Sequence, residues 1–137
     1  MRPRVRYTYI LIGVIGFLIL GRYIGSPVSI VIVAGTSMRP SLEIGDLAFL
    51  VKMDFDVGDL VLWCRDNLNC ILHRVYEVNQ THVTTKGDAN IAPDPPITID
   101  KVEYTALFTI PSYIWIPITV VLIYLVDRYE SREEGIR

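Results

Sequence analysis

Two apolar stretches lie at opposite ends of this 137-residue chain, and they restrict the folds open to the segment between them. The first, at residues 7–24, has YILIGVIGFLIL at its centre and follows Arg2, Arg4 and Arg6. The second, at residues 106–126, contains no charged residue and reaches the length of about 20 residues that crosses a bilayer. Hydrophobic residues make up 51% of the chain, so part of the apolar surface is expected to face lipid.

The charges around these stretches predict the side of the membrane on which each segment lies. Arginines before the first stretch favour the cytoplasm, which places the middle segment outside it. A cleavable signal peptide is the alternative interpretation of the first stretch, because small residues such as Gly25 and Ser26 follow the apolar core. Either interpretation sends the middle segment across the membrane. The expected organisation is a cytoplasmic N-terminus at 1–6, a transmembrane helix at 7–24, an extracytoplasmic catalytic β domain at 25–105, a second transmembrane helix at 106–126 and a cytoplasmic tail at 127–137.

The middle segment consists of short runs of β-branched and aromatic residues separated by glycine, aspartate, asparagine and proline. Such runs between turn-forming residues are typical of strands. Strands are expected at 30–34, 46–51, 59–63, 71–78, 81–86 and 97–104. The predicted fold class is therefore mainly β, as a small extracytoplasmic domain between two transmembrane α-helices.

Cys64 and Cys70 flank a predicted hairpin turn, and two interpretations of them stay open. An oxidising extracytoplasmic setting would permit a disulfide that supports a small core, whereas the alternative is a pair of buried thiols. Two cysteines and two histidines lack the paired spacing of structural zinc sites, so no metal is expected. The net charge of -2, with no long basic patch, argues against nucleic acid as a partner.

Three residues could together support serine hydrolysis, which needs an exposed hydroxyl, a base and a group that orients the base. Ser37 lies in a turn after an apolar run, His73 lies within a predicted strand, and Asp94 lies in a proline-rich loop. Each has an ordinary interpretation when taken alone: a turn-forming serine, a structural histidine and a carboxylate that caps a turn. His82 is the other histidine, and its polar neighbours predict a solvated strand face.

Four ordered sequence blocks give these residues a common context. They are AGTSMRPSL at 34–42 followed by Gly45-Asp46, VGDLV at 57–61, LHRV at 72–75 and KGDAN at 86–90 with Asp94 beyond it. This series resembles the blocks of type I signal peptidases, a family of membrane-anchored serine endopeptidases. The resemblance covers residues 30–104, and the two flanking apolar stretches also suit that family.

The third block indicates which catalytic design of the family this chain resembles. Bacterial members typically place a lysine before the arginine of this block, whereas His73 stands there in this chain. The match is thus to the archaeal and endoplasmic-reticulum branch, in which the base is a histidine. By resemblance, Ser37 is the nucleophile, His73 the base, and Asp94 the carboxylate that orients the imidazole. Asp88 is then a supporting carboxylate that holds its loop in place.

The residues around Ser37 are expected to complete the site. The backbone N–H of Ser37 is the expected oxyanion donor. Many family members carry a serine two residues before the nucleophile, but this chain has Gly35 there, which leaves Thr36 or the backbone alone to assist. Met38 is expected to help form a substrate pocket, with packing in the core as the alternative.

The resemblance implies removal of N-terminal signal peptides from secreted and membrane preproteins, after small residues, without a metal or organic cofactor. Expected partners are those signal peptides and the lipid membrane, with the protein-translocation machinery as a further candidate. The expected location is the cell membrane, crossed twice, with the catalytic domain outside the cytoplasm. Three alternatives stay open: a peptidase dedicated to one surface or secreted substrate, an inactive relative that serves as a membrane assembly subunit, and a β domain without hydrolytic function.

Overall fold

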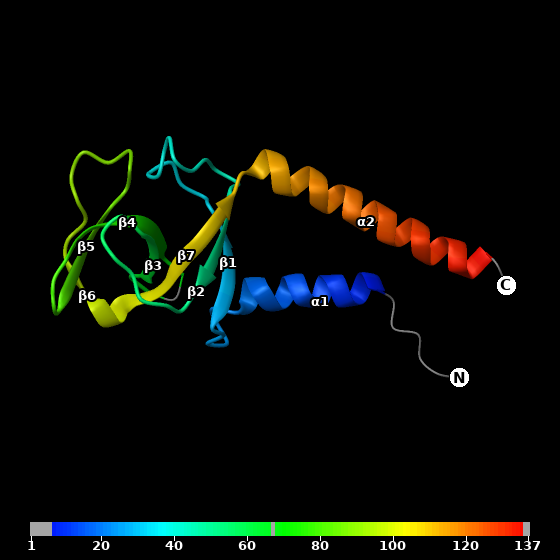
Figure 1. The fold of residues 1–137 in the computed structure, drawn as a ribbon, viewed down its shortest axis with the longest axis horizontal. Coiled ribbons are helices and arrows are strands. Elements are labelled where there is room, and N and C mark those ends of the chain that lie inside the picture. The colour runs from blue at the N-terminus through cyan, green and yellow to red at the C-terminus, as the bar shows by residue number, and fades with distance from the viewer. Residues whose placement is uncertain (1–6, 67, 136–137) are drawn as a thin grey trace.

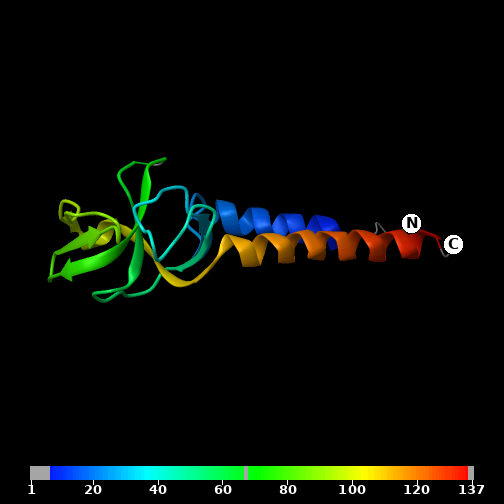
Figure 2. The ribbon, with the colours of Figure 1, turned by 90° about the horizontal axis from the view of Figure 1, so that it is seen from above.

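The computed structural model describes residues 7–66 and 68–135, with side chains described up to residue 132. It shows a mainly β domain from which two helices extend side by side (Figures 1 and 2). The elements are α1 (Tyr7–Leu20), β1 (Val28–Ile32), β2 (Leu47–Val51), β3 (Leu60–Cys64), β4 (Cys70–Val78), β5 (His82–Lys86), β6 (Ile97–Thr98), a short 3₁₀ turn (Ile99–Lys101), β7 (Val102–Ile110) and α2 (Ser112–Gly135). The mainly β fold predicted from sequence is confirmed. The predicted cytoplasmic N-terminus at 1–6 lies outside the described residues.

The seven strands form one curled antiparallel sheet in the order β1-β2-β7-β3-β4-β5-β6. Strand β3 lies near the middle of the sheet. Neighbouring residues of a strand point to opposite faces, and the consecutive residues 61–63 are all buried, so β3 is covered on both faces. Leu62 belongs to a cluster with Ala48, Leu50 and Tyr104, whereas Val61 belongs to a cluster with Val75 and Val83. The domain thus has two small cores, one on each face of the sheet.

Strand β7 begins later and ends later than the strand that the sequence pattern predicts at residues 97–104. Residues 97–104 were expected as one strand, but β6 ends at Thr98 and β7 runs from Val102 to Ile110. The second helix accordingly begins at Ser112, after Pro111, and not at residue 106. Residues 106 and 108–110 instead pair with β2, with Leu47 opposite Ile110 and Phe49 stacked on Phe108. The first part of the second apolar stretch therefore belongs to the sheet.

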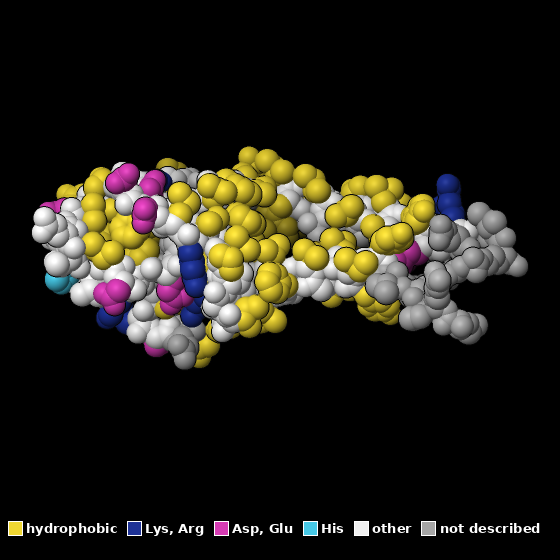
Figure 3. Space-filling model, turned by 60° about the horizontal axis from the view of Figure 1, so that its bottom comes forward, with side chains coloured by type: hydrophobic (Ala, Val, Ile, Leu, Met, Phe, Trp, Pro, Cys, Tyr) yellow, Lys and Arg dark blue, Asp and Glu magenta, His cyan; other side chains and the backbone are white. Residues whose placement is uncertain are grey.

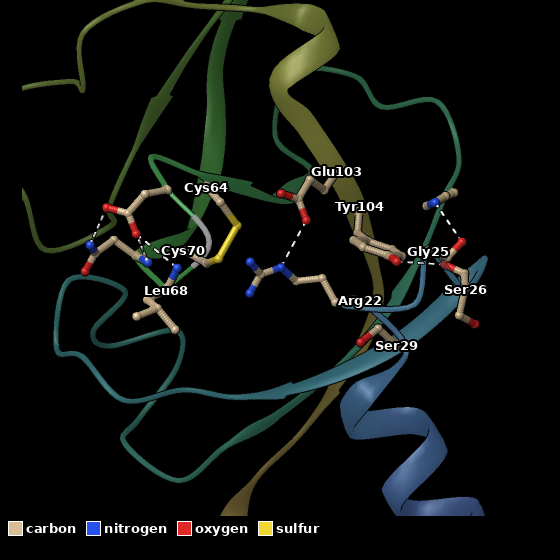
Figure 4. Close-up of polar contacts among 12 residues, drawn as sticks. Arg22, Gly25, Ser26, Ser29, Cys64, Leu68, Cys70, Glu103 and Tyr104 are labelled. Atoms are coloured by element: carbon tan, nitrogen blue, oxygen red, sulfur yellow. Dashed lines mark hydrogen bonds and ion pairs between the residues drawn. A yellow bond between two sulfur atoms is a disulfide. The ribbon is translucent and has the colours of Figure 1, made fainter.

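Helix α1 is also shorter than the predicted span of 7–24, because the chain turns at residues 21–25. A side chain at Gly21 would meet the backbone oxygen of Val28 at 2.6 Å, so only glycine lets the turn fold back this tightly. The turn is then fixed from several sides (Figure 4). The Tyr104 hydroxyl donates to the Ser26 backbone oxygen at 2.7 Å, and the Arg22 guanidinium pairs with Glu103 at 3.1 Å. These contacts attach α1 rigidly to the start of β1.

The two helices expose mostly apolar side chains. Figure 3 shows hydrophobic side chains along both helices and on the adjoining part of the domain. Within the described residues, one stretch, Ser112–Arg132 of α2, has the length and composition of a membrane crossing, and α1 is apolar but shorter. The ends of the helices away from the sheet meet where the Thr8 hydroxyl donates to the Glu130 carboxylate at 2.9 Å. Tyr7 and Tyr129 pack edge to face beside this contact.

Asp46 connects the segment after β1 to the start of α2. Its carboxylate accepts a hydrogen bond from the Ser112 N–H at 2.8 Å and another from the Glu43 N–H at 2.9 Å. Its backbone oxygen accepts from the Val33 N–H at 2.8 Å. The first N–H groups of a helix have no partner within the helix, so this buried carboxylate satisfies one of them and complements the helix dipole. We define the serine loop as residues 33–46. Asp46 holds both ends of this loop.

Replacement of Asp46 by alanine should therefore destabilise the protein. The loss of a buried acceptor for two N–H groups is expected to lower the free energy of unfolding by ~2 kcal/mol. Thermal unfolding in detergent micelles would measure this as a lower midpoint temperature. The exposed Asp54→Ala variant is the control and should unfold close to the parent; equal midpoints for all three proteins would contradict the role given to Asp46.

Candidate active site

Ser37 is presented by a compact turn of the serine loop. The turn contains hydrogen bonds from the Arg39 N–H to the Thr36 oxygen at 3.1 Å and from the Leu42 N–H to the Met38 oxygen at 3.0 Å. Met38 and Leu42 are only 2% and 4% exposed, so their side chains fix the turn in the core while Ser37 remains partly exposed. The hydroxyl of Ser37 is thus held at the surface by its buried neighbours.

His73 lies in the middle of β4, directly opposite Val61 of β3, and is 6% exposed. Its Nε2 atom lies 2.9 Å from the Ser37 Oγ atom. On the other side of the ring, the Nδ1 atom lies 2.6 Å from Asp94 Oδ2. The structure therefore brings together the three residues selected from the sequence, in the order hydroxyl, imidazole, carboxylate.

This arrangement can perform nucleophilic chemistry at the hydroxyl. With Nδ1 protonated and donating to Asp94, Nε2 carries the lone pair that can take the proton of Ser37. Asp94 fixes this orientation of the ring and would stabilise the imidazolium that forms when Ser37 attacks. The contacts have the lengths of formed hydrogen bonds, so no side-chain rearrangement is needed before the attack.

The loop that carries Asp94 also contacts the backbone of Ser37. We call residues 87–96 the acidic loop. The Ala89 N–H donates to the Ser37 backbone oxygen at 2.8 Å, and a side chain at Gly87 would meet the same oxygen at 2.6 Å. A glycine is therefore required where this loop crosses the serine loop. The contact aligns the two loops that supply the hydroxyl and the carboxylate.

Asp88 supports the acidic loop, as the sequence predicts. Its two carboxylate oxygens accept from Arg74 Nε and Nη2 at 3.0 and 2.9 Å, and Arg74 also donates to the Gly58 backbone oxygen at 2.8 Å. The hydrogen bonds from Arg74 hold the pKa of Asp88 below its ordinary value, with smaller contributions from Ser41 and from the charge of His73. Asp88 does not contact Ser37 Oγ through any described hydrogen bond, so its role is to hold β4 and the loop together.

A cleft of about 480 Å³ opens beside Ser37, between the β1 side of the sheet and the β3–β4 hairpin. Residues of the edge strand β1 and of β4 both line this cleft. Lining residues include Ile32, Ala34, Gly35 and Met38 on one side and Leu72 on the other. Met38 lines the cleft although its side chain is almost fully buried, so its packing in the core is observed and its part in a substrate pocket stays a prediction.

Gly35, Thr36 and the Ser37 N–H are the other parts of the serine loop that the sequence predicts to belong to the site. Thr36 and Gly35 are exposed, and nothing lies within 4 Å of the point where a Gly35 side chain would begin. Within residues 7–66 and 68–135, the Ser37 N–H donates to no other protein group, which leaves it available to an oxyanion.

The structure also shows where the two cysteines and the second histidine lie. Cys64 and Cys70 form a disulfide across the β3–β4 hairpin, which decides between the two interpretations of the sequence (Figure 4). His82 is exposed and its ring contacts the Thr81 hydroxyl, away from Ser37. No group of three or more possible metal ligands occurs among the described side chains.

Three residues of the site were not singled out from the sequence: Arg74, Thr85 and Trp63. Thr85 donates to Asp94 Oδ2 at 2.7 Å, and Trp63 donates to Thr85 at 3.0 Å. Arg74 adjoins His73 in the LHRV block, so its proximity to the site was visible in the sequence. The other two face the same side of the sheet as His73, but this follows only from the pairing register of β3, β4 and β5.

No protein-family model, curated protein or solved structure matches this chain. Any assignment of function therefore depends on the geometry of the site and on the sequence blocks.

The crossing of the two loops predicts a specific effect of Gly87→Ala. The added methyl group would push the acidic loop away from the Ser37 backbone oxygen and break the hydrogen bond from Ala89. Hydrogen–deuterium exchange should then be faster at the Ala89 amide than in the parent, with a loss of stability of about 1–3 kcal/mol from the steric conflict. Gly13→Ala, at a position with open space, is the control; unchanged exchange in Gly87→Ala would contradict the close approach.

The lowered pKa of Asp88 predicts how its contribution to stability depends on pH. Because the folded state depresses this pKa, the stabilisation is present above the unfolded-state pKa and is lost as the pH falls through the folded value. Arg74 is 37% exposed, so solvent screening limits the contribution to about 1 kcal/mol. The unfolding midpoints of the parent and of Asp88→Asn should differ at pH 7, and the difference should shrink as the pH falls below the unfolded-state pKa of about 4.

A double-mutant cycle isolates the ion pair. In an Arg74→Gln background, Asp88→Asn should produce a much smaller difference that varies little with pH. A difference that is equally large without Arg74 would show that Asp88 acts through something other than this pair.

Proposed function

We propose that this chain is a membrane-anchored serine endopeptidase of the type I signal peptidase class, which removes N-terminal signal peptides from preproteins after small residues. The observation that carries the proposal is the hydrogen-bonded series Ser37–His73–Asp94, joined by contacts of 2.9 and 2.6 Å. These three residues come from three separate parts of the chain. The sequence blocks that contain them also resemble those of the histidine-using branch of the family.

The mechanism follows from the orientation of His73. Nε2 takes the proton of the Ser37 hydroxyl as Oγ attacks the scissile carbonyl, and the resulting imidazolium donates its proton to the leaving amine. Water then attacks the acyl group on Ser37, again with His73 as the base. The developing oxyanion is stabilised by the Ser37 N–H. This chemistry needs no metal or organic cofactor.

The cleft beside Ser37 suits an extended peptide. Strand β1 has one hydrogen-bonding edge paired with β2 and the other directed toward the cleft, so a substrate could add as a further strand along Ile32–Gly35. The residues of this segment nearest the serine, Ala34 and Gly35, are small. A peptide there would pass close to Ser37 Oγ in the conformation that serine peptidases require, with its own small side chains directed into the cleft.

The proposed membrane placement depends on the apolar helices. Helix α2 would cross the bilayer, whereas the 14 residues of α1, at 1.5 Å each, give about 21 Å, less than the ~30 Å hydrocarbon core. A short α1 held rigidly to β1 would keep the base of the domain at the membrane surface, with Arg22 and Tyr23 at the interface. The cleft would then face signal peptides that emerge from the membrane outside the cytoplasm.

Cleavage of a preprotein by membranes that contain the protein tests this proposal. Ser37→Ala and His73→Ala should each lower kcat/KM by roughly 10³-fold or more, because nucleophile and base act as one unit. Asp94→Asn should also lower it strongly, since the imidazole loses the acceptor that fixes its orientation.

Two matched variants serve as controls for this experiment. His82→Ala changes the other histidine and should cleave at the parent rate, and Asp88→Asn should retain far more activity than Asp94→Asn. Equal cleavage by the parent and Ser37→Ala would overturn the proposal. A panel of preproteins would show whether the enzyme accepts signal peptides in general or one dedicated substrate.

A further inference from the structure

Asp94 is attached to strand β5 through two hydrogen bonds with one residue, Thr85. The Asp94 backbone N–H donates to the Thr85 backbone oxygen at 2.8 Å, and the Thr85 hydroxyl donates to Asp94 Oδ2 at 2.7 Å. Asp94 lies in the acidic loop and not in a strand, so the strand that borders β4 positions it through these two contacts. The same oxygen, Oδ2, also receives the hydrogen bond from His73 Nδ1.

The Thr85 hydroxyl is in turn oriented by Trp63, which lies on the other side of β4. The indole Nε1 of Trp63 lies 3.0 Å from Thr85 Oγ1, and both side chains are buried, at 4% and 1% exposure. Trp63 belongs to β3 and Thr85 to β5, so the contact passes over β4, the strand that carries His73. The side chains of His73, Trp63 and Thr85 lie on one face of the sheet. Residues 71 and 75 of β4 point to the same side as His73, and they pair with Trp63 and Thr85.

The donor properties of these groups fix the direction of every hydrogen bond in the series. An indole N–H can only donate, so Thr85 Oγ1 accepts from Trp63. A hydroxyl has one proton, and no water reaches a threonine with 1% exposure, so that proton is directed to Asp94 Oδ2. Because Oδ2 then acts as an acceptor toward Thr85, it accepts from His73 as well. The ring is thereby set with its proton on Nδ1 and its lone pair on Nε2, toward Ser37.

We infer that Thr85 and Trp63 are positioning residues of the active site, which hold Asp94 so that His73 keeps the tautomer able to act as a base. This inference deepens the proposed peptidase function and rests on it for its effect on catalysis. Its effect on the state of His73 does not depend on the identity of the substrate.

Isosteric and conservative variants separate this role from simple packing. Thr85→Val keeps the shape and removes the hydroxyl, so kcat for preprotein cleavage should fall roughly 10- to 100-fold, less than the ~10⁴-fold loss caused by the wrong tautomer. KM should stay within about 2-fold, because the substrate does not touch Thr85. Thr85→Ser restores the hydroxyl and should recover most of kcat. Trp63→Phe keeps a ring and removes the donor, with a smaller loss of kcat than Thr85→Val.

The chain has two histidines, which allows a second readout that needs no activity. Nitrogen NMR of ¹⁵N-histidine-labelled protein in micelles, in the His82→Gln background, would report His73 alone. At a pH where the ring is neutral, we expect the Nδ1–H tautomer in the parent and in Thr85→Ser. We expect a mixture of the two tautomers in Thr85→Val, with less of the Nδ1–H form than in the parent.

The outcomes distinguish the two proposals. Full kcat in Thr85→Val, or equal losses in Thr85→Val and Thr85→Ser, would overturn the positioning role, as would an unchanged tautomer in Thr85→Val. If the parent fails to cleave preproteins, the proposed function is wrong, and the tautomer measurement still decides whether Thr85 controls His73. Unfolding midpoints of the variants would exclude loss of the fold as the cause.

Discussion

Strand β7 pairs with β2 on one side and with β3 on the other, and the candidate active site depends on this double pairing. The β1–β2 side of the sheet carries the serine loop, whereas β4 and the acidic loop after β5 supply His73 and Asp94. Without β7 these two parts would share few backbone hydrogen bonds. The strand also continues through Pro111 into α2, and α1 leads directly into β1. Both apolar helices are therefore attached to the part of the sheet that carries Ser37.

A domain of this size has little apolar core, and polar contacts fix much of its geometry. Asp46 holds the ends of the serine loop and the start of α2, the Ala89 N–H holds the middle of that loop, and Arg74 links β4 to Asp88. The Cys64–Cys70 disulfide closes the hairpin that forms one wall of the cleft. Among the described residues, no buried side-chain nitrogen or oxygen lacks a hydrogen bond. The residues that support the fold are thus largely those that place the site.

The sequence predicted the strands of the domain well because alternation and turn residues are local signals. It also selected Ser37, His73 and Asp94, through blocks whose order resembles a known family. It failed at residues 106–110, because an apolar run at the end of a strand looks the same in sequence as one that begins an apolar helix. Thr85 and Trp63 could not be found from the sequence, because their contact crosses β4 and depends on the register of three strands.

The central claim is that His73 activates the side chain at position 37. The pH dependence of alkylation of a cysteine placed at this position tests the claim directly. Among the described residues no free cysteine is present, so Ser37→Cys introduces a single reactive thiol. Its alkylation by iodoacetamide should persist well below the ordinary thiol pKa of about 8.5, because a neighbouring imidazolium stabilises the thiolate. Adding His73→Ala should return the pH dependence to that of an ordinary thiol. Identical profiles with and without His73 would contradict the account.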